Sequence, residues 1–599
     1  MKASWVLGAL IPFACYAQAE NTSSDNDIIV TASRMPQSTN DVLAPYTIIS
    51  AKQIEQMQAK SIADVLAMQP GVQIRESGGR GTTTALSIRG SNSDQTLVLI
   101  DGVRAMSASL GTGTFNFLPT SMVERIEIIR GPRAARYGAD AMAGVVNIIT
   151  KPSAKEKVNR ILAGVGEHNY WQSGWRFVHP LGENTQFQAN LDAEGSDGYN
   201  FKPDSTPAHN YGYSTQQGLF SVQHRFNDNW SADGEVILNR GHGQYNGYNM
   251  TTEADNTLIQ QYFSSSLFYD ANSYSSHWNL NYGVDDSRDY SSSYSRYVTQ
   301  RYAGSWLNSW QLNNNWQLDA GLDARQTNLG RSSTDFSETK RYNVGGYSSV
   351  SYLQGPYLVD ASLRQDHNER YGNNTTYSVA GGWTYLSNQQ VKLSYGTAFH
   401  APTFNDLYWP LSYGYQGNPN LKPEKSQNLE LGFKGQVQNI HYEWNLYRTN
   451  YRDLIETTSD YSTTDNVSKA RVMGSEFVLK FVTGPIHQQL SYTYLDSENK
   501  QTNKVLSYRP WNSGKWQADW LVLPKLNLHT GINWSGHRFS SSTERLPSYW
   551  TMNIAAGYQF TSAFKLSASV HNLLDRDYEQ TTDYRAPGIQ TNLTAQYDF

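Results

Sequence analysis

The 599-residue sequence contains a single cysteine, Cys15, and after Ala19 it has no long apolar run. Cys15 lies inside a segment that resembles an export signal, so the mature chain is expected to have no disulfide and no thiolate chemistry. A transmembrane helix needs about 18 or more consecutive apolar residues, which excludes one here. The formal net charge of −5 is small and dispersed, which argues against a nucleic-acid partner.

Residues 1–19 have the features of a cleaved secretory signal peptide. Lys2 supplies the positive charge, residues 5–13 form a short apolar run, and residues 17–19 (AQA) match a small-residue cleavage site. A lipoprotein signal would use Cys15, but the residues before it match the small-residue pattern of such signals poorly. We therefore expect export, and an exported chain without apolar helices can cross a membrane only as a closed barrel.

Aromatic residues are abundant in a chain that is polar on average. Only 38% of the residues are hydrophobic and the mean hydropathy is −0.60, yet the chain holds 40 Tyr, 16 Trp and 20 Phe. Aromatic side chains favour strands and membrane interfaces. A soluble all-β protein such as a propeller also mixes aromatic, glycine and polar residues, so composition leaves that alternative open.

Three regions follow the signal peptide, and the first two end at residue 152. We assign residues 20–36 to an N-terminal segment and residues 37–152 to a compact α+β domain with its own core. Residues 145–149 (VVNII) read as one of its short apolar strands. Residues 51–68 have the apolar spacing of one amphipathic helix, which Pro70 and the following glycine would end.

Residues 153–599 repeatedly alternate polar and apolar side chains between clusters of Asn, Gly, Asp and Pro. The alternation is clearest at 186–194, 440–446, 526–534 and 593–599. This length allows about 22 membrane strands with their connections, at roughly 20 residues each. A barrel of that size encloses a plugged lumen. We predict an all-β transmembrane barrel of about 22 antiparallel strands, with the N-terminal α+β domain as a plug inside the lumen.

The connections between strands are expected to differ at the two ends of this barrel. Outer-membrane barrels have short periplasmic turns and longer extracellular loops. We expect residues 226–230 to form a periplasmic turn. Residues 287–299, which are rich in Ser and Tyr, are expected to form an extracellular loop.

Short motifs are spread over the plug and the barrel. They are 42–45 (VLAP), 88–90 (IRG), 97–104 (LVLIDGVR), 123–127 (VERIE), 129–133 (IRGPR), 137–138 (YG), 144–150 (GVVNIIT), 401–402 (AP), 417–424 (GNPNLKPE), 474–476 (GSE) and 572–575 (NLLD). Together they resemble the motifs of the TonB-dependent outer-membrane receptors, and within that family those of the cobalamin (vitamin B12) receptors. The resemblance runs from Asp27 to Phe599 and is strongest over the plug.

The resemblance implies an energy-coupled import receptor in the outer membrane of a Gram-negative bacterium. Cobalamin would be its ligand, and the TonB protein with its inner-membrane motor complex would be its partner. Outer-membrane lipid and the barrel-assembly machinery are further expected partners, and we expect a monomer. Residues 582–599 would hold the C-terminal strand, whose final aromatic residue serves assembly.

A short β-favouring segment follows the signal peptide. By itself such a segment is more often an edge strand than a docking peptide. The resemblance implies a TonB box, which would add a strand to the sheet of its partner. Because the outer membrane has no nucleotide supply, a tightly held ligand must be released by work passed through a periplasmic contact. The residues of this box are Asp27, Ile28, Ile29, Val30, Thr31 and Ala32.

The resemblance also implies a set of ligand contacts on the plug apex and one barrel loop. The amide of Asn92 can both donate to and accept from the side-chain amides of a corrin. Thr83 and Ala85 differ in size from the family residues, so they would supply shape only. For Arg509, a solvated loop arginine is an equal alternative. The full set is Thr83, Ala85, Asn92, Ser109, Leu110, Gly111 and Arg509.

Four plug arginines would need carboxylate partners if they face the barrel wall, because an unpaired buried charge is costly. They are Arg89, Arg125, Arg130 and Arg133. Glu476 is one candidate partner on the barrel. Such pairs would lock the plug to the wall rather than contact the ligand.

The calcium site of the cobalamin receptors is expected to be absent. Calcium needs about 6 to 8 oxygen ligands, several of them carboxylates. The corresponding positions hold too few carboxylates and are Asn200, His209, Tyr211, Asn246 and either Asp255 or Asn256. We therefore predict no metal and no cofactor, with loop order supplied by Tyr and Asn contacts.

Three other functions remain open on the sequence. The same plug and barrel could serve a ferric siderophore or another metal chelate, because the fold does not determine the ligand. An uncoupled porin or adhesin would not need the plug and its TonB box, and a soluble periplasmic β protein would not need a lipid-facing surface. No local spacing indicates a catalytic site, so we expect no catalytic residues and no enzymatic activity.

Overall fold

The alternating segments form long strands whose two faces meet different surroundings. In β12 (Thr185–Tyr199), Gln188, Asp192 and Glu194 are buried, and the two carboxylates contact the enclosed domain. Leu191, on the opposite face, is 42% exposed. Successive side chains of a strand point to opposite faces, so one face can meet lipid while the other meets the lumen.

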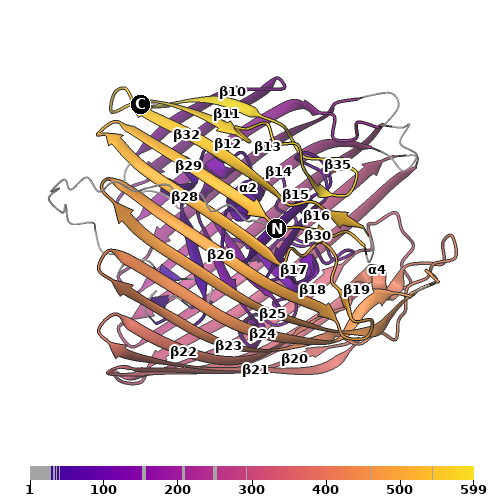
Figure 1. Ribbon diagram of the computed structural model, residues 1–599. Helices are drawn as coiled ribbons and strands as arrows, with labels where there is room; N and C mark the ends of the chain where they lie inside the picture. The colour runs from indigo at the N-terminus through magenta and orange to yellow at the C-terminus, as the bar shows by residue number, and fades with distance from the viewer. Residues whose placement is uncertain are drawn as a thin grey trace, which may run out of the picture.

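These strands close into a barrel around the N-terminal domain (Figure 1). Its first strand, β10, pairs antiparallel with its last, β36, for example at Val165 and Leu593. Among the described residues, 22 strands make the closed wall, which confirms the predicted fold class. The computed structural model describes residues 29–30, 34–35, 37–38, 41–150, 157–204, 209–246, 253–291, 293–458, 460–541 and 544–599.

All four of the clearest alternating segments lie in wall strands, namely β12, β24, β29 and β36. Short strands extend from the long-loop end, namely β27 (Lys504–Val505), β30 (Arg538–Phe539), β31 (Arg545–Leu546), β34 (Glu579–Thr581) and β35 (Tyr584–Arg585). Besides β12, the wall strands are β10 (Val158–Gly166), β11 (Tyr170–Pro180), β13 (Tyr211–Arg225), β14 (Trp230–Asn246), β15 (Glu253–Ala271), β16 (Tyr274–Tyr290), β17 (Tyr294–Gln311), β18 (Trp316–Asn328), β19 (Lys340–Gln354), β20 (Tyr357–Asn368), β21 (Gly372–Leu386), β22 (Gln389–His400), β23 (Glu424–Val437), β24 (Ile440–Thr457), β25 (Thr464–Thr483), β26 (Ile486–Asn499), β28 (Asn512–Leu523), β29 (Leu526–Ser535), β32 (Tyr549–Gln559), β33 (Phe564–His571) and β36 (Gln590–Asp598).

The enclosed domain, called the plug below, is built on a five-stranded sheet of order β3-β8-β9-β6-β7. Its core contains fully buried Val65, Leu66, Ile88, Val146 and Ile148. No helix in the described part of the chain is long and apolar enough to cross a membrane. The plug elements are β3 (Tyr46–Ser50), α1 (Ala51–Met57), α2 (Ile62–Ala67), β4 (Val72–Glu76), β5 (Thr84–Ile88), β6 (Thr96–Ile100), β7 (Val103–Arg104), β8 (Val123–Arg130), α3 (Ala134–Tyr137) and β9 (Gly144–Thr150), with 3₁₀ turns at Ser93–Gln95 and Thr120–Met122.

The single helix expected at 51–68 is wrong, because the structure has two helices there. Gln58 ends α1 in the left-handed region at φ 47°. Ser61 then caps α2: its side chain accepts a hydrogen bond from the backbone of Asp64, whose carboxylate accepts one in return. This capping box satisfies the free N–H groups of a new helix start, so the apolar spacing continues across two short helices.

Connections differ in length at the two ends of the barrel. At one end they are short turns, such as 181–184, 226–229 and 355–356. At the other end most connections are longer, and 401–423 and 572–589 are the longest. In outer-membrane barrels the short turns are periplasmic and the long loops extracellular, which places the expected turn near 226–230 at the periplasmic end.

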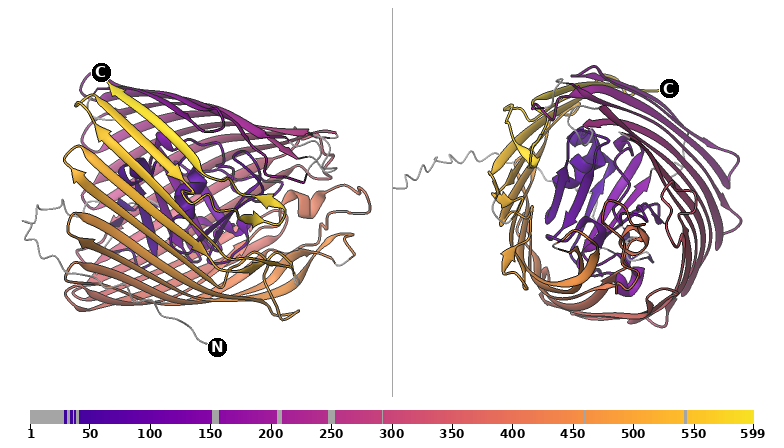
Figure 2. Two further views of the ribbon diagram at one scale, coloured as in Figure 1. Left: turned by 45° about the horizontal axis from the view of Figure 1, so that its top comes forward. Right: turned by 90° about the vertical axis from the view of Figure 1, so that its right-hand side faces the viewer.

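Figure 2 shows, in its right-hand view, the plug inside the ring of strands.

The extracellular loop expected at 287–299 is mostly wrong, because these residues extend β16 and β17. The two strands remain paired up to Tyr290 and Tyr294. Asp286 accepts hydrogen bonds from Arg288 and from Arg296, which ties the hairpin together. Ser and Tyr are compatible with strands, so the polar composition of this segment did not indicate a loop.

Candidate functional site

A cavity of about 360 Å³ lies at the long-loop end, between the plug hairpin β4–β5 and the barrel around β28 and β29. Four of the seven residues expected to contact ligand line it, namely Ala85, Asn92, Leu110 and Arg509. We call this space the apical cavity. Folding therefore brings together plug and barrel residues that are more than 400 positions apart in the sequence.

The other three expected contacts lie elsewhere on the plug apex. Thr83 is exposed in the turn between β4 and β5. Ser109 is buried, with its carbonyl accepting a hydrogen bond from the backbone of Asn405 at 3.4 Å. Gly111 adopts φ 75°, a conformation that glycine reaches without strain. The segment from 107 to 112 is thus held by the loop that contains α4 (Phe404–Tyr408).

Arg509 fastens its barrel loop to the plug. Its Nε donates to the carbonyl of Gly90 at 3.0 Å, and its Nη2 donates to Oδ1 of Asn92 at 2.5 Å. These contacts do not fit a solvated loop arginine. Oδ1 of Asn92 therefore already accepts one hydrogen bond, and Asn92 also lines the cavity.

Sequence reasoning did not identify the cationic residues that share this cavity. Arg75, Lys515 and Arg538 also line it. Arg75 lies over the ring of Tyr508, with its guanidinium carbon 4.3 Å from the ring centroid. No motif includes these residues, and in the sequence they are ordinary polar positions of strands and loops.

A buried ionic cluster joins the plug to the wall strands β23 and β25. Arg89 donates to both carboxylate oxygens of Glu430 at 2.9 Å and to Glu476 at 2.8 Å. The Nε of Arg130 lies 3.4 Å from Glu476. Burial alone would lower the pKa of Arg89, but the two glutamates hold that pKa well above its usual value. We call these four residues the ionic lock.

Gly71 shows how closely the plug backbone approaches this lock. Its φ is 68°, and a Cβ atom at this position would collide with the carboxylate of Glu476. Sequence reasoning identified Arg89, Arg130 and Glu476 but not Glu430. Glu430 sits in the alternating strand β23, where nothing local distinguishes it from other lumen-facing polar residues.

The remaining two arginines do not make the plug-to-barrel contacts expected of them. Arg125 donates to Glu127 at 2.7 Å, and both residues belong to β8 of the plug. Arg133 has no ion pair with any described residue, and its Nη2 donates to the carbonyl of Arg130 at 3.4 Å. Burial lowers the pKa of Arg133 to about 10. Position in a motif therefore did not determine which arginine meets the wall.

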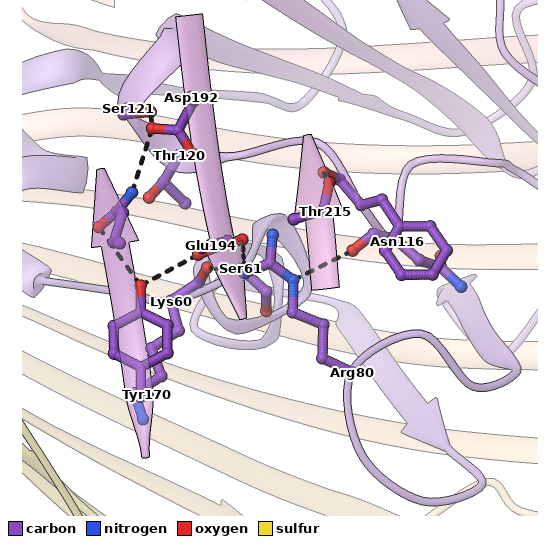
Figure 3. Close-up of polar contacts among 12 residues, drawn as sticks. Lys60, Ser61, Arg80, Asn116, Thr120, Ser121, Tyr170, Asp192, Glu194 and Thr215 are labelled. Carbon is purple, nitrogen blue, oxygen red and sulfur yellow. Dashed lines mark hydrogen bonds and ion pairs between the residues drawn. The ribbon is translucent and has the colours of Figure 1, made fainter. Parts of the chain in front are cut away.

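A second plug-to-wall cluster lies at β11 and β12 (Figure 3). Arg80 of the plug forms an ion pair with Glu194, which also accepts a hydrogen bond from Tyr170 at 3.0 Å. Ser121 of the plug donates to Asp192 at 2.8 Å. The plug is thus held on two sides of the lumen, here and at the ionic lock.

A third cluster includes Asp94, which lines the apical cavity. His400 at the end of β22 contacts two plug carboxylates, Asp140 at 3.0 Å and Asp94 at 3.6 Å. Arg104 contacts Asp140 at 2.9 Å. Burial alone would raise the pKa of Asp140, but His400 and Arg104 hold that pKa well below its usual value. Asp94, which lines the cavity, is therefore connected to the barrel wall through His400.

Glu76 at the end of β4 predicts a pH dependence of stability. Its backbone N–H donates to Gln580 at 2.8 Å, and its carbonyl accepts from Thr581 at 3.0 Å. Burial, and then the nearby Asp64, raise the pKa of its carboxyl from 4.5 to about 8. The stabilising contribution of the neutral carboxyl is complete below 4.5 and is lost as the pH rises toward about 8.

We therefore expect Glu76→Gln to raise the thermal unfolding temperature of the detergent-solubilised protein at about pH 9 and to change it little at about pH 4. Glutamine keeps the shape of the side chain but cannot ionise. Thermal unfolding of wild type and variant at both pH values measures the effect. An equal difference at the two pH values would show that ionisation of Glu76 is not involved.

The N-terminal segment is attached to the plug and the barrel just after the expected TonB box. Arg34 donates to the carboxylate of Asp323 on β18 at 2.7 Å and to the carbonyl of Arg136 at 3.0 Å. Within the box, Ile29–Val30 form β1, which pairs with β2 (Gln37–Ser38). The other box residues, Asp27, Ile28, Thr31 and Ala32, lie outside the described residues.

The positions matching a calcium site make mainly protein contacts. Oδ1 of Asn200 accepts from the backbone of Lys202 at 2.9 Å, and the rings of His209 and Tyr211 are 5.2 Å apart. Asn246 ends β14, and Asp255 and Asn256 lie in β15. Within the described ranges, no group of three or more His, Cys, Asp or Glu is arranged to hold a metal ion. The absence of calcium stays a prediction.

Two family descriptions match most of the chain. Residues 38–145 match the TonB-dependent Receptor Plug Domain. Residues 155–573 match the TonB dependent receptor-like β-barrel. The first match falls on the plug of the structure and the second on its barrel.

Named relatives are similar over the full length of the chain. The vitamin B12 transporter BtuB of Photobacterium profundum is 32% identical over 615 aligned positions, which cover 100% of both chains. The vitamin B12 transporter BtuB of Vibrio vulnificus is 29% identical and covers 96% of this chain and 94% of its own. The likeness to both relatives therefore spans nearly the whole of each chain.

Solved structures of siderophore receptors, rather than of vitamin B12 transporters, share the fold. A variant of the ferric enterobactin receptor PfeA of Pseudomonas aeruginosa has a TM-score of 0.82 at 20% identity, covering 96% of this chain and 100% of its own. The siderophore receptor PirA of Acinetobacter baumannii has a TM-score of 0.81 at 20% identity, covering 92% and 98%. At this identity the likeness shows the fold alone.

Proposed function

Since the chain belongs to the TonB-dependent receptor family, we propose that it imports cobalamin (vitamin B12) across the outer membrane of a Gram-negative bacterium. The observation that carries the choice of ligand is the 32% identity to a vitamin B12 transporter over the whole of both chains. The members of the family named above are receptors and transporters, which supports a transport role rather than an enzymatic one.

The apical cavity supports a ligand site at the extracellular end. Ala85, Asn92 and Leu110 from the plug and Arg509 from a barrel loop reach one space. A ligand that contacts both parts would favour one relative position of plug and barrel over another. Such differential contact is the requirement for coupling a binding site to a distant segment.

Release would depend on the periplasmic end of the plug. TonB, driven by its inner-membrane motor complex, would add the box at 27–32 to its own sheet and pull on the plug. The ionic lock and the cluster at Arg80 would hold the plug until then. We expect a monomer assembled by the barrel-assembly machinery and surrounded by outer-membrane lipid, with no resident cofactor and no calcium.

A ligand titration tests the choice of cobalamin. The purified full-length receptor, which has 16 tryptophans, is titrated with cyanocobalamin and with a panel of ferric siderophores while tryptophan fluorescence is followed. We expect saturable quenching by cyanocobalamin at nanomolar to micromolar concentrations, typical of a specific site. Saturation by a siderophore and none by cyanocobalamin would replace cobalamin by the siderophore alternative.

A ferric siderophore is the second candidate ligand. The solved structures of siderophore receptors share the barrel and plug, but that likeness carries the fold alone. An uncoupled porin or adhesin fits less well, because the plug fills the lumen and is held to the wall by buried ion pairs. Deletion of the box at residues 27–32 would abolish uptake only in a coupled receptor.

A further inference from the structure

The charges that face the apical cavity are unbalanced. Three guanidinium groups line it, those of Arg75, Arg509 and Arg538, together with the amine of Lys515. Asp94 is the one carboxylate that lines it among the described residues, and Asp94 already lies 3.6 Å from His400. Guanidinium groups keep their charge in proteins, so the cavity carries an excess of positive charge.

None of the three arginines is neutralised by an ion pair within the described residues. The donors of Arg509 are used by Gly90, Asn92 and a third carbonyl, so that residue mainly positions the loop. Arg538 donates to the carbonyls of Pro547 and Glu579, which hold it in place without cancelling its charge. A desolvated charge that meets only carbonyl oxygens remains available to an anion.

Arg75 is the most available of the three. It has neither an ion pair nor a hydrogen bond to any described residue, and it is only half-buried. Its guanidinium lies over the ring of Tyr508, which is a stacked arrangement that leaves the edge N–H groups free. Tyr508 itself has φ 61°, a conformation that non-glycine residues seldom adopt. Backbone strain of this kind persists where the surrounding structure enforces it, often at ligand sites.

The size of the cavity limits what can enter it. Sites for whole drug-sized ligands range from about 300 to 1,000 Å³, and this cavity of about 360 Å³ is at the lower end. It could therefore hold a projecting group of a large ligand but not the whole. The part of the ligand that enters the cavity must carry negative charge and accept several hydrogen bonds. A phosphate, or another anionic group with several oxygen atoms, meets both requirements.

We propose that the apical cavity binds an anionic oxygen group of the transported ligand, with Arg75 and Arg538 as its direct contacts. This inference rests on the proposed function. In cobalamin the group is the phosphodiester of the nucleotide loop, which cobinamide lacks. The site then discriminates the complete vitamin from its precursor. In an anionic ferric catecholate, the same contacts would go to the negatively charged oxygens of the chelate.

The test compares cyanocobalamin with dicyanocobinamide on the full-length receptor in detergent. Wild type is expected to bind cyanocobalamin about tenfold more tightly, which is typical of a hydrogen bond to a charged group. The double variant Arg75→Gln, Arg538→Gln is expected to lose that preference: its affinity for cyanocobalamin falls while its affinity for dicyanocobinamide is unchanged. Arg75→Lys, which retains the charge, is expected to keep more of the preference than Arg75→Gln.

Arg545→Gln is the matched control. Arg545 lies on the same β30–β31 hairpin as Arg538 and carries the same charge, but it does not line the cavity. The control is expected to retain the wild-type preference. Migration of each variant as a heat-modifiable barrel on an SDS gel shows that it has folded. An equal loss for both corrinoids, or an unchanged preference in the double variant, overturns the proposal.

Failure of the proposed function gives a different result. In that case wild type binds neither corrinoid, and the same variants are titrated with ferric enterobactin, an anionic catecholate chelate. The anionic contact is supported for that ligand if the double variant loses about tenfold in affinity for ferric enterobactin and the Arg545→Gln control does not. Added salt is then expected to make this loss smaller. An unchanged affinity for ferric enterobactin overturns the anionic contact together with the cobalamin assignment.

Discussion

Deleting residues 27–32 is expected to abolish energy-dependent uptake of the ligand and to leave its binding at the cell surface unchanged. In the proposed function the box provides the periplasmic contact through which work reaches the plug, whereas the apical cavity lies at the long-loop end of the barrel. Uptake and surface binding of labelled cyanocobalamin, measured on the same cells with and without a proton-motive-force inhibitor, give the two results. Uptake in the deletion variant is expected to equal that in the inhibited wild type.

A substitution pair sharpens this experiment. Strand addition uses the main-chain N–H groups of the box, so Val30→Pro removes a donor and is expected to reduce uptake strongly. Val30→Thr keeps the N–H group and the branched shape, so it is the control and is expected to preserve uptake. Full uptake in the deletion variant would favour an uncoupled porin over a coupled receptor.

Replacing Glu476 by Gln is expected to loosen the plug strongly, because Glu476 meets both arginines of the ionic lock. Glu476 accepts from Arg89 and lies against Arg130, and all three side chains are buried. Removing one partner of a buried ion pair typically costs about 3–5 kcal/mol, because the remaining charge is left uncompensated. Hydrogen exchange of the plug strands β6 and β9 is expected to accelerate by about a hundredfold or more.

Asp286→Asn provides the matched control for the lock. Asp286 forms ion pairs with two arginines, as Glu476 does, but Asp286 and both of its arginines belong to the barrel hairpin β16–β17. Its loss is expected to leave exchange in the plug unchanged. Equal exchange rates in wild type and Glu476→Gln would show that the lock contributes little to the hold on the plug.

The parts of the site that sequence reasoning identified are those carried by motifs. Arg89 and Arg130 lie in the IRG motifs, and Asn92 and Arg509 came from the family resemblance. Glu430 was missed because it is one of many polar residues on the lumen-facing side of a strand. Arg75 and Arg538 were also missed. Neither lies in a motif, and the other residues of the cavity come from distant parts of the chain.

Local periodicity predicted the strands and their two faces. Side-chain alternation has a period of two in any strand, so the two faces could be read directly from residues. The strand count followed from that period and from chain length, whereas the closed barrel and the plug also rested on the export signal, the lack of apolar helices and the family resemblance. Helix ends depended on finer detail, because a capping box at Ser61 divided one apolar stripe between two helices.

The partners of buried charges depend on folding instead. Arg89 meets Glu430 and Glu476 across 341 and 387 positions of sequence, and Arg509 meets Asn92 across 417. Such pairs follow from how the plug is rotated and seated in the lumen, which no local pattern encodes. The same seating brings Arg75 and Arg538 to one cavity, because a charge becomes a binding contact only where the surrounding structure leaves it without a carboxylate partner.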